Sequence, residues 1–237
     1  MNMDYENVLQ RLKEERVRNN LSQRQISYQM HMMQSHYSKA ELGKKRFTFY
    51  EMQCLTNTEI DIQYMYTGLR STKKYREFFE GCTFEEIICY ISIFYSMAAC
   101  LGRENSAGKW GKIYKRIEYM KFIFMTGREN DNIFFAIRQQ LAYTQHKMAE
   151  LLGVDIKKLR ELENGRVLPD SEMLWKIYDL FHVPPSIILR DGKGLAQELC
   201  LLLEISGEEE GEAIFAYLQA GQKCLGEICE KDFNFRR

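Results

Sequence analysis

An internal repeat with an offset of 122 residues constrains the fold of this chain more than any other feature. Residues 22–44 read SQRQISYQMHMMQSHYSKAELGK, and residues 144–166 read TQHKMAELLGVDIKKLRELENGR. An Arg, a Gln and a Glu keep the same spacing in both copies: Arg16, Gln23 and Glu41 in the first, and Arg138, Gln145 and Glu163 in the second. A repeat of this kind predicts two copies of one structural unit.

Each copy predicts two short helices that cross steeply around a tight turn. In the first copy, a helix over residues 4–19 leads to Ser22, whose side chain suits the N-terminal cap of a second helix. His31 stands at the turn position, which requires a positive φ and usually takes glycine. The third helix then runs from residue 33 or 34 to residue 42, and Gly43 ends it.

Both copies have an apolar inner face. Tyr37 and Ala40 occupy inward positions of the third helix in the first copy, and Leu159 and Leu162 correspond to them in the second. A large residue beside a small one fills roughly the same space as two leucines, so both cores can be well packed. Two further helices within residues 48–66 complete a compact helical domain of ordinary size.

Both copies resemble the Cro/C1-type helix-turn-helix family of phage repressors, the XRE family. The second copy follows the family pattern almost position by position, whereas the first departs from it at His31 and Ala40. The resemblance covers residues 5–68 and 133–190, about half the chain. It implies two lambda-repressor-like bundles, each of which places its third helix in the major groove of double-stranded DNA.

The remaining stretches also predict helices. Thr83 followed by Glu86 is a capping box, and it precedes an uncharged run over residues 87–101. This run is too short for a membrane span, and a helix that is apolar on all sides is buried in a core or an oligomer interface. With a second helix over residues 110–125, it predicts an antiparallel hairpin. A homo-oligomer through residues 83–125 is therefore one hypothesis.

The predicted fold class is all-α: two helix-turn-helix bundles joined by a helical hairpin, with a C-terminal helical extension. The predicted domains are 1–69 (DNA-binding), 70–130 (hairpin), 131–191 (second helix-turn-helix) and 192–237 (acidic C-terminal helices). A polar linker is expected at residues 127–132.

Composition fits a globular helical protein. Three prolines are few for 237 residues, which favours helix. The net charge is zero, but residues 191–237 carry 10 Asp and Glu against 5 Lys and Arg, so an acidic C-terminus masks a mildly basic remainder. No segment has the pattern of a secretion signal or a membrane span, so a cytoplasmic location is expected.

The third helix of the first copy supplies the first set of candidate DNA contacts. Gln34 can read adenine and Lys39 can reach guanine, with Ser35 and His36 beside them. The remaining candidates contact phosphates and fix register without reading sequence: Gln23, Lys44, Lys45 and Arg46. The competing interpretation is a solvated polar surface without a partner.

The second copy supplies candidates of mixed character. Ile156 can meet a thymine methyl and Glu161 can accept a hydrogen bond from cytosine. Ile156 can equally pack on a partner, and Glu161 can equally repel phosphate. The other candidates are Gln145, Lys157, Lys158 and Arg166. The second copy, which matches the family pattern more closely, is thus not the better candidate for a DNA-reading surface.

No enzyme, metal site or cofactor is expected. Glu41 and Glu163 invite a catalytic interpretation, but the resemblance assigns them structural ion pairs with Arg16 and Arg138. Seven cysteines without a Cys-x-x-Cys pair argue against a disulfide framework and a zinc site. Cys224 and Cys229 are predicted as buried thiols, with redox sensing as an alternative.

These features predict a sequence-specific DNA-binding transcriptional regulator in which one chain mimics the usual repressor dimer. The alternative is a sensor or protein-interaction module, in which the second copy and the C-terminal helices bind a peptide or protein effector.

Overall fold

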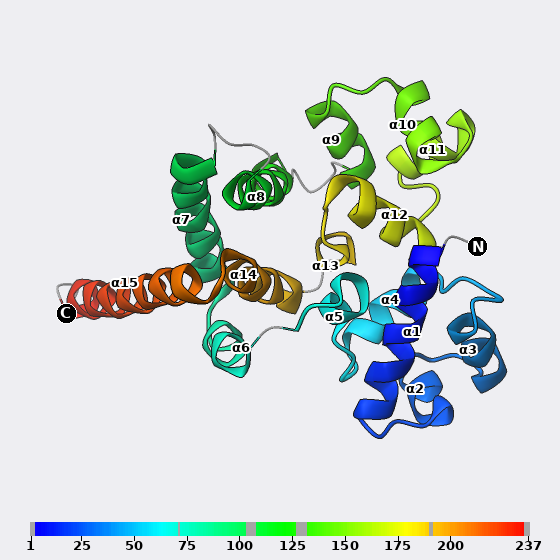
Figure 1. Ribbon diagram of the computed structural model, residues 1–237, viewed down its shortest axis with the longest axis horizontal. Coiled ribbons are helices and arrows are strands. Elements are labelled where there is room, and N and C mark those ends of the chain that lie inside the picture. The colour runs from blue at the N-terminus through cyan, green and yellow to red at the C-terminus, as the bar shows by residue number, and fades with distance from the viewer. Residues whose placement is uncertain (1–2, 71, 103–107, 127–131, 190–191, 235–237) are drawn as a thin grey trace. The chain divides into compact units, whose positions relative to one another are not determined.

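The computed structural model describes residues 3–70, 72–102, 108–126, 132–189 and 192–234, and throughout these ranges the regular structure is helical, without strands (Figure 1). The predicted all-α class is confirmed. The chain forms two compact units, residues 1–70 with 119–194 and residues 71–118 with 195–237.

The first unit contains both copies of the repeat. The N-terminal segment (residues 3–70) has five helices: α1 (Met3–Arg18), α2 (Gln23–Gln29), α3 (Gln34–Glu41), α4 (Phe49–Thr56) and α5 (Ile62–Thr67). The central segment (residues 132–189) has five in the same order: α9 (Ile133–Gln140), α10 (Gln145–Leu152), α11 (Ile156–Glu163), α12 (Ser171–Phe181) and α13 (Pro185–Leu189).

Backbone conformation repeats at equivalent turns. His31 has φ +54° and Gly153, at the matching position, has φ +65°, so the prediction that His31 adopts the left-handed region is confirmed. Gly43 and Gly165 also match, with φ of +70° and +66°. Ser22 caps α2 through its side chain and forms a capping box with Gln25. Local sequence therefore sets the same helix boundaries in both segments.

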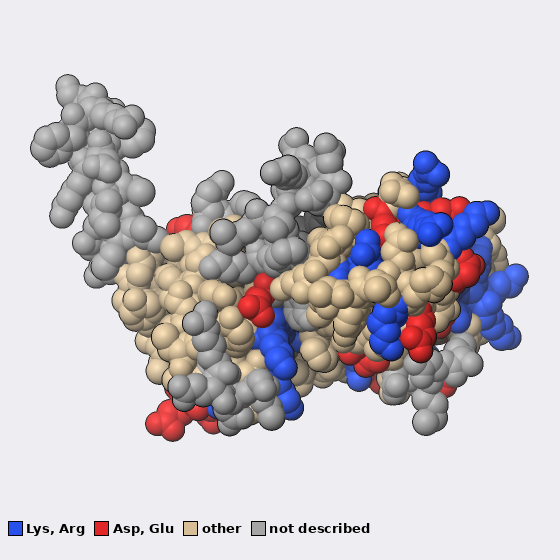
Figure 2. All heavy atoms as spheres, turned by 90° about the horizontal axis from the view of Figure 1, so that it is seen from above, with Lys and Arg blue, Asp and Glu red and all other residues tan. Residues whose placement is uncertain are grey.

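The two segments share one continuous hydrophobic core. The face drawn in Figure 2 carries many of their Lys, Arg, Asp and Glu side chains, while Glu15, Glu41 and Glu163 are buried. Tyr37, Ala40, Leu159 and Leu162 are all buried, as predicted. Between the segments, α1 packs on α12, and α13 packs on α4 and α5. The segments are thus two halves of one folded body.

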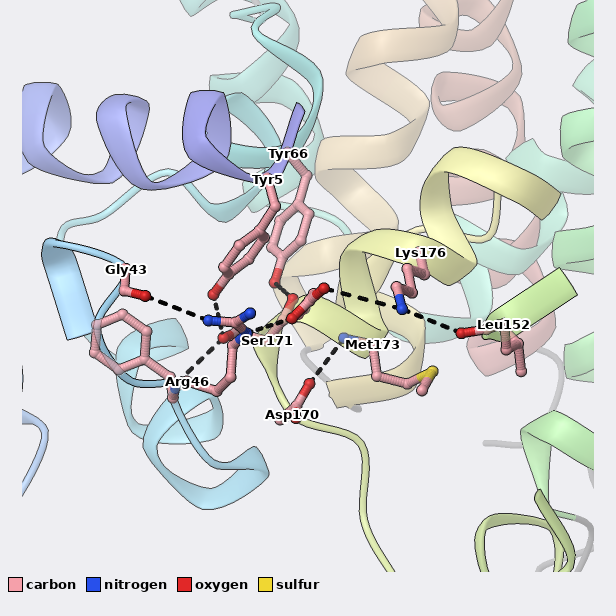
Figure 3. A network of polar contacts seen from close by, with 11 residues as sticks. Tyr5, Gly43, Arg46, Tyr66, Leu152, Asp170, Ser171, Met173 and Lys176 are labelled. Carbon is pink, nitrogen blue, oxygen red and sulfur yellow. Dashed lines mark hydrogen bonds and ion pairs between the residues drawn. The ribbon is translucent and has the colours of Figure 1, made fainter. Parts of the chain in front are cut away.

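Ser171, at the start of α12, is the centre of the polar contacts between the segments (Figure 3). Its Oγ lies 2.5 Å from the Tyr5 hydroxyl and accepts a hydrogen bond from the Phe47 amide at 3.2 Å. Its own amide donates to the Phe47 carbonyl at 3.0 Å, and its carbonyl accepts from the Tyr66 hydroxyl at 3.4 Å. Ser171 is 2% exposed, so these bonds are made away from water.

A charged contact lies beside this centre. Arg46 forms an ion pair with Glu172, and its guanidinium lies 5.2 Å from the ring centroid of Tyr5. Gln53 adds a hydrogen bond to the Leu189 carbonyl at 3.3 Å. Polar pairing at a buried interface is directional, so these bonds fix how one segment sits on the other.

The second unit is built from five helices: α6 (Lys73–Glu80), α7 (Phe84–Gly102), α8 (Lys109–Thr126), α14 (Gly192–Ser206) and α15 (Glu208–Asn234). Phe215 of α15 lies in an aromatic cluster with Tyr75, Phe78 and Phe79 of α6. A buried ion pair between Arg116 and Glu198 ties α8 to α14.

Helix α7 and residues 109–118 of α8 belong to one compact unit with the C-terminal helices. The Thr83–Glu86 capping box is present. Cys100 and Leu101 are exposed, so the helix over the uncharged run is not buried on all sides. The four-domain division and an oligomer through residues 83–125 stay predictions. Most of the predicted 127–132 linker and the side chains of Cys224 and Cys229 lie outside the described residues.

We expect Ser171→Ala to lower the free energy of unfolding by about 1–3 kcal/mol, because the Phe47 amide and the Tyr5 hydroxyl lose a buried partner. Urea unfolding measures this, with the exposed Ser35→Ala as the matched control, which should change stability by less than about 0.5 kcal/mol. Equal effects of the two changes would show that Ser171 does not hold the segments together.

Stability should also fall at alkaline pH through Tyr5. Burial raises the pKa of Tyr5 to about 12, whereas an unfolded tyrosine has a pKa of about 10. The protonated phenol is favoured in the fold, so its contribution is complete below pH 10 and is lost as pH rises toward 12. Wild-type protein should therefore lose more unfolding free energy over this range than Tyr5→Phe. A parallel decline would assign the effect to other groups.

Candidate nucleic-acid interface

A buried carboxylate holds the third helix of the N-terminal segment to the first. Glu41 ends α3 and receives the Arg16 guanidinium of α1 at 2.7 and 3.3 Å. Arg16 also donates to the Leu21 carbonyl at 2.9 Å, and Gln23 donates to Glu41 at 2.6 Å. The hydrogen bond to Glu41 raises the pKa of Arg16. Three helices are thereby joined at one point.

The central segment contains the same arrangement. Arg138 pairs with Glu163 and donates to the Tyr143 carbonyl at 3.2 Å. Gln145 donates to Glu163 at 2.9 Å and accepts from Arg160 at 3.2 Å. The structural role predicted for both glutamates is confirmed. The two glutamines direct their amide nitrogens to these carboxylates, so their contact with phosphate stays a prediction.

We call the exposed face of the first pair of short helices the α2–α3 surface, formed by Arg24, Gln34, Ser35, Lys39, Lys44 and Lys45, all of which are exposed. His36 is half-buried beside them, and its Nε2 lies 2.8 Å from the Lys45 Nζ. The predicted residues Gln34, Ser35, His36 and Lys39 therefore stand together on α3, with Lys44 and Lys45 just beyond its end.

The charge of this surface is of one sign. Between residues 22 and 47 the only acidic side chain is Glu41, which is 8% exposed and paired with Arg16. Cations without neighbouring carboxylates produce a local positive potential, which favours a polyanion.

Beside Gln34 the surface is hollowed. A pocket of about 420 Å³ is lined by Arg24, Gln25, Ser27, Tyr28, Met32 and Gln34. Tyr28 is 83% exposed, and Met33, which precedes α3, is 69% exposed. Apolar side chains at the start of a recognition helix can contact thymine methyls.

Arg46 is placed differently from the prediction. Its guanidinium pairs with Glu172, lies against Tyr5 and reaches the Gly43 carbonyl at 3.4 Å. It holds the two segments together, and its contact with phosphate stays a prediction. The physical reason is that the central segment packs where the sequence suggested open solvent.

The corresponding α10–α11 surface comprises Lys147, Ile156, Lys157, Lys158, Glu161 and Arg166, of which Ile156 and Glu161 are half-buried and Ile156 packs against the hydrophobic core. Its charge is mixed: Glu150 pairs with Lys147 at 3.2 Å, and Asp155 caps α11 next to Lys157 and Lys158. Figure 2 shows Lys and Arg interleaved with Asp and Glu at the end of the first unit where Figure 1 places α10 and α11. This surface attracts a polyanion less strongly than the α2–α3 surface.

Four exposed residues of these two surfaces are not among the candidates predicted from the sequence: Arg24, Tyr28, Lys147 and Arg160. Arg24 and Tyr28 lie on α2, Lys147 lies on α10, and Arg160 lies near the end of α11. Helical periodicity could have identified them. The sequence already indicates the buried face of each helix, and a residue two or five places from a buried position lies on the opposite face.

A family model described as a helix-turn-helix domain matches residues 135–193. The match covers nearly all of the central segment. No curated protein and no solved structure shows significant similarity to the chain. The helix-turn-helix domain is consistent with DNA binding, and the all-helical fold agrees with it.

The described part of the chain shows neither a metal-binding group nor a membrane-spanning helix. There, His, Cys, Asp and Glu side chains nowhere gather in the groups of three or more that could hold a metal ion. In the same residues, each helix is too short or too polar to cross a membrane.

We expect Glu163→Ala to destabilise the protein by about 3–5 kcal/mol, because it leaves Arg138 buried without a counter-ion. Since the two segments share a core, the single unfolding transition of the first unit should shift as a whole. Calorimetry measures this, with the exposed, ion-paired Glu150→Ala as control. Separate melting of the two segments would contradict a shared core.

Proposed function

We propose that this protein is a sequence-specific DNA-binding transcriptional regulator of the Cro/C1 type. The observation that carries the proposal is the α2–α3 surface, where exposed cations lie on α2, on α3 and just beyond the end of α3, and the sole carboxylate is buried and paired. Phosphate neutralisation by Lys and Arg supplies affinity, and side chains at the start of a helix in the major groove supply specificity.

Each side chain has a distinct role in this proposal. Gln34 reads adenine through N6 and N7, and Lys39 reaches guanine O6 and N7. Ser35 and His36 assist at adjacent bases. Lys44 and Lys45 contact backbone phosphates and fix the register, together with the amides at the start of α2.

The N-terminal segment is, in this proposal, a second copy of the helix-turn-helix domain. Its support is the repeated helix order, the repeated Arg–Glu–Gln contact and the matching positive φ at His31 and Gly153. We further propose that the protein acts in the cytoplasm and has no catalytic activity. A peptide or protein effector stays a prediction.

Selection from a pool of random duplex DNA tests the proposal. Wild-type protein should enrich one motif, with the logarithm of affinity falling linearly with the logarithm of salt concentration. Gln34→Ala/Lys39→Ala should lose the motif and weaken binding roughly 30-fold or more, since each of the two base contacts that it removes contributes about 1–3 kcal/mol.

Gln10→Ala/Lys13→Ala is the matched control, because it removes the same residue types from exposed positions of α1. It should leave both motif and affinity unchanged. If wild-type protein bound no duplex at low salt, the regulator proposal would fail.

A further inference from the structure

The contact between the two segments can form in only one pairing. Ser171 and Glu172 supply its polar centre, and the residues at the equivalent positions of the N-terminal segment are Phe49 and Tyr50. Neither can reproduce the hydrogen bonds of a serine or the charge of a glutamate. Two N-terminal segments from different chains would therefore lack this polar centre.

Two central segments from different chains cannot form the same contact either. Arg46 is the partner of Glu172, and the central segment has Leu168 at the equivalent position. A pair of central segments would keep the ion pair between Lys176 and Glu172 within each copy, at 3.9 Å, but would lose the cation that Arg46 supplies across the contact. The pairing is therefore heterologous and is made between two segments that the same chain always supplies together.

This contact leaves both candidate surfaces open. It uses α1, α4 and α5 of one segment and α12 and α13 of the other, whereas Lys39 on α3 and Lys157 on α11 remain exposed. In Figure 1, α2 and α3 lie at one end of the first unit and α10 and α11 at the other, with the packed helices between them.

The two surfaces differ in the side chains that would meet bases. Gln34 and Lys39 on α3 correspond to Ile156 and Glu161 on α11. Gln and Lys suit adenine and guanine, whereas Ile and Glu suit a thymine methyl and the amino group of cytosine. The two helices therefore prefer different base sequences.

Resting on the proposed function, we infer that one chain binds one two-part DNA site that is not a palindrome, with its two parts at a fixed spacing. A homodimer presents two identical surfaces and so selects a palindrome. In this protein the central segment takes the place of the second, identical subunit of such a homodimer. The Ser171 contact, which fixes one segment on the other, fixes the spacing of the two parts.

The motif enriched by wild-type protein should consist of two unlike parts, with one chain per duplex. Inserting five base pairs between the parts, about half a turn of DNA, puts the second part on the opposite face of the helix. Affinity should then fall about 100-fold or more, to that of the α2–α3 surface alone.

Changing the α10–α11 surface should change only the second part. Lys157→Glu/Lys158→Glu should remove the second part while the first is kept. Ile156→Gln/Glu161→Lys gives α11 the side chains that α3 has at Gln34 and Lys39, so the second part should become more like the first. Glu150→Lys, at an exposed position of α10, is the matched charge control. It should leave the sequence of the second part unchanged.

Two outcomes would overturn the inference while the proposed function stands. One is a single short motif that tolerates the insertion and is unaffected by Lys157→Glu/Lys158→Glu, which would leave the central segment to a protein or peptide partner. The other is a palindrome bound by two chains. A wild-type chain that bound no duplex at all would instead remove the proposed function itself.

Discussion

The orientation of each third helix depends on one buried carboxylate. The side chains of Glu41 and Glu163 are 3% and 5% exposed, and a desolvated carboxylate must be matched by donors. In both segments an arginine and a glutamine converge on it from two other helices. The exposed side chains of α3 and α11 can present a defined pattern to a partner only because these helices cannot turn about their axes.

The N-terminal segment adds a hydrogen bond to this contact, and it differs from the central segment at Tyr37 and at His31. Tyr37 stands at the position equivalent to Leu159 of the central segment, and its hydroxyl donates to Glu41 at 3.1 Å. Burial raises the pKa of Tyr37, so the phenol remains a donor. His31 adopts a positive φ that glycine reaches without strain. Added hydrogen bonding at Tyr37 thus accompanies a less favourable turn.

Local features of the fold could be predicted from sequence, whereas the contact between segments could not. Caps such as Ser22 and the left-handed turn at His31 follow from local sequence, and the buried pairs Arg16–Glu41 and Arg138–Glu163 are what the family resemblance implies. The partner of Arg46 lies 126 residues away, and no periodic pattern connects Arg46 with Glu172. For this reason the sequence predicts Arg46 as a phosphate contact, whereas in the structure it lies at the contact between the segments.

The exposed candidates stand where they were expected, because helical periodicity decides which side chains face outward. What they bind is decided by chemistry that periodicity does not describe. A family pattern records buried leucines, capping residues and turn glycines, and the central segment keeps these at Leu159, Leu162 and Gly153. It does not record the sign of the charges on the outer face of the third helix. The central segment, which matches the family, therefore carries Glu161 on its third helix, while the N-terminal segment carries Lys39 there. Agreement with the family at buried and turn positions thus does not determine how well the outer surface suits DNA.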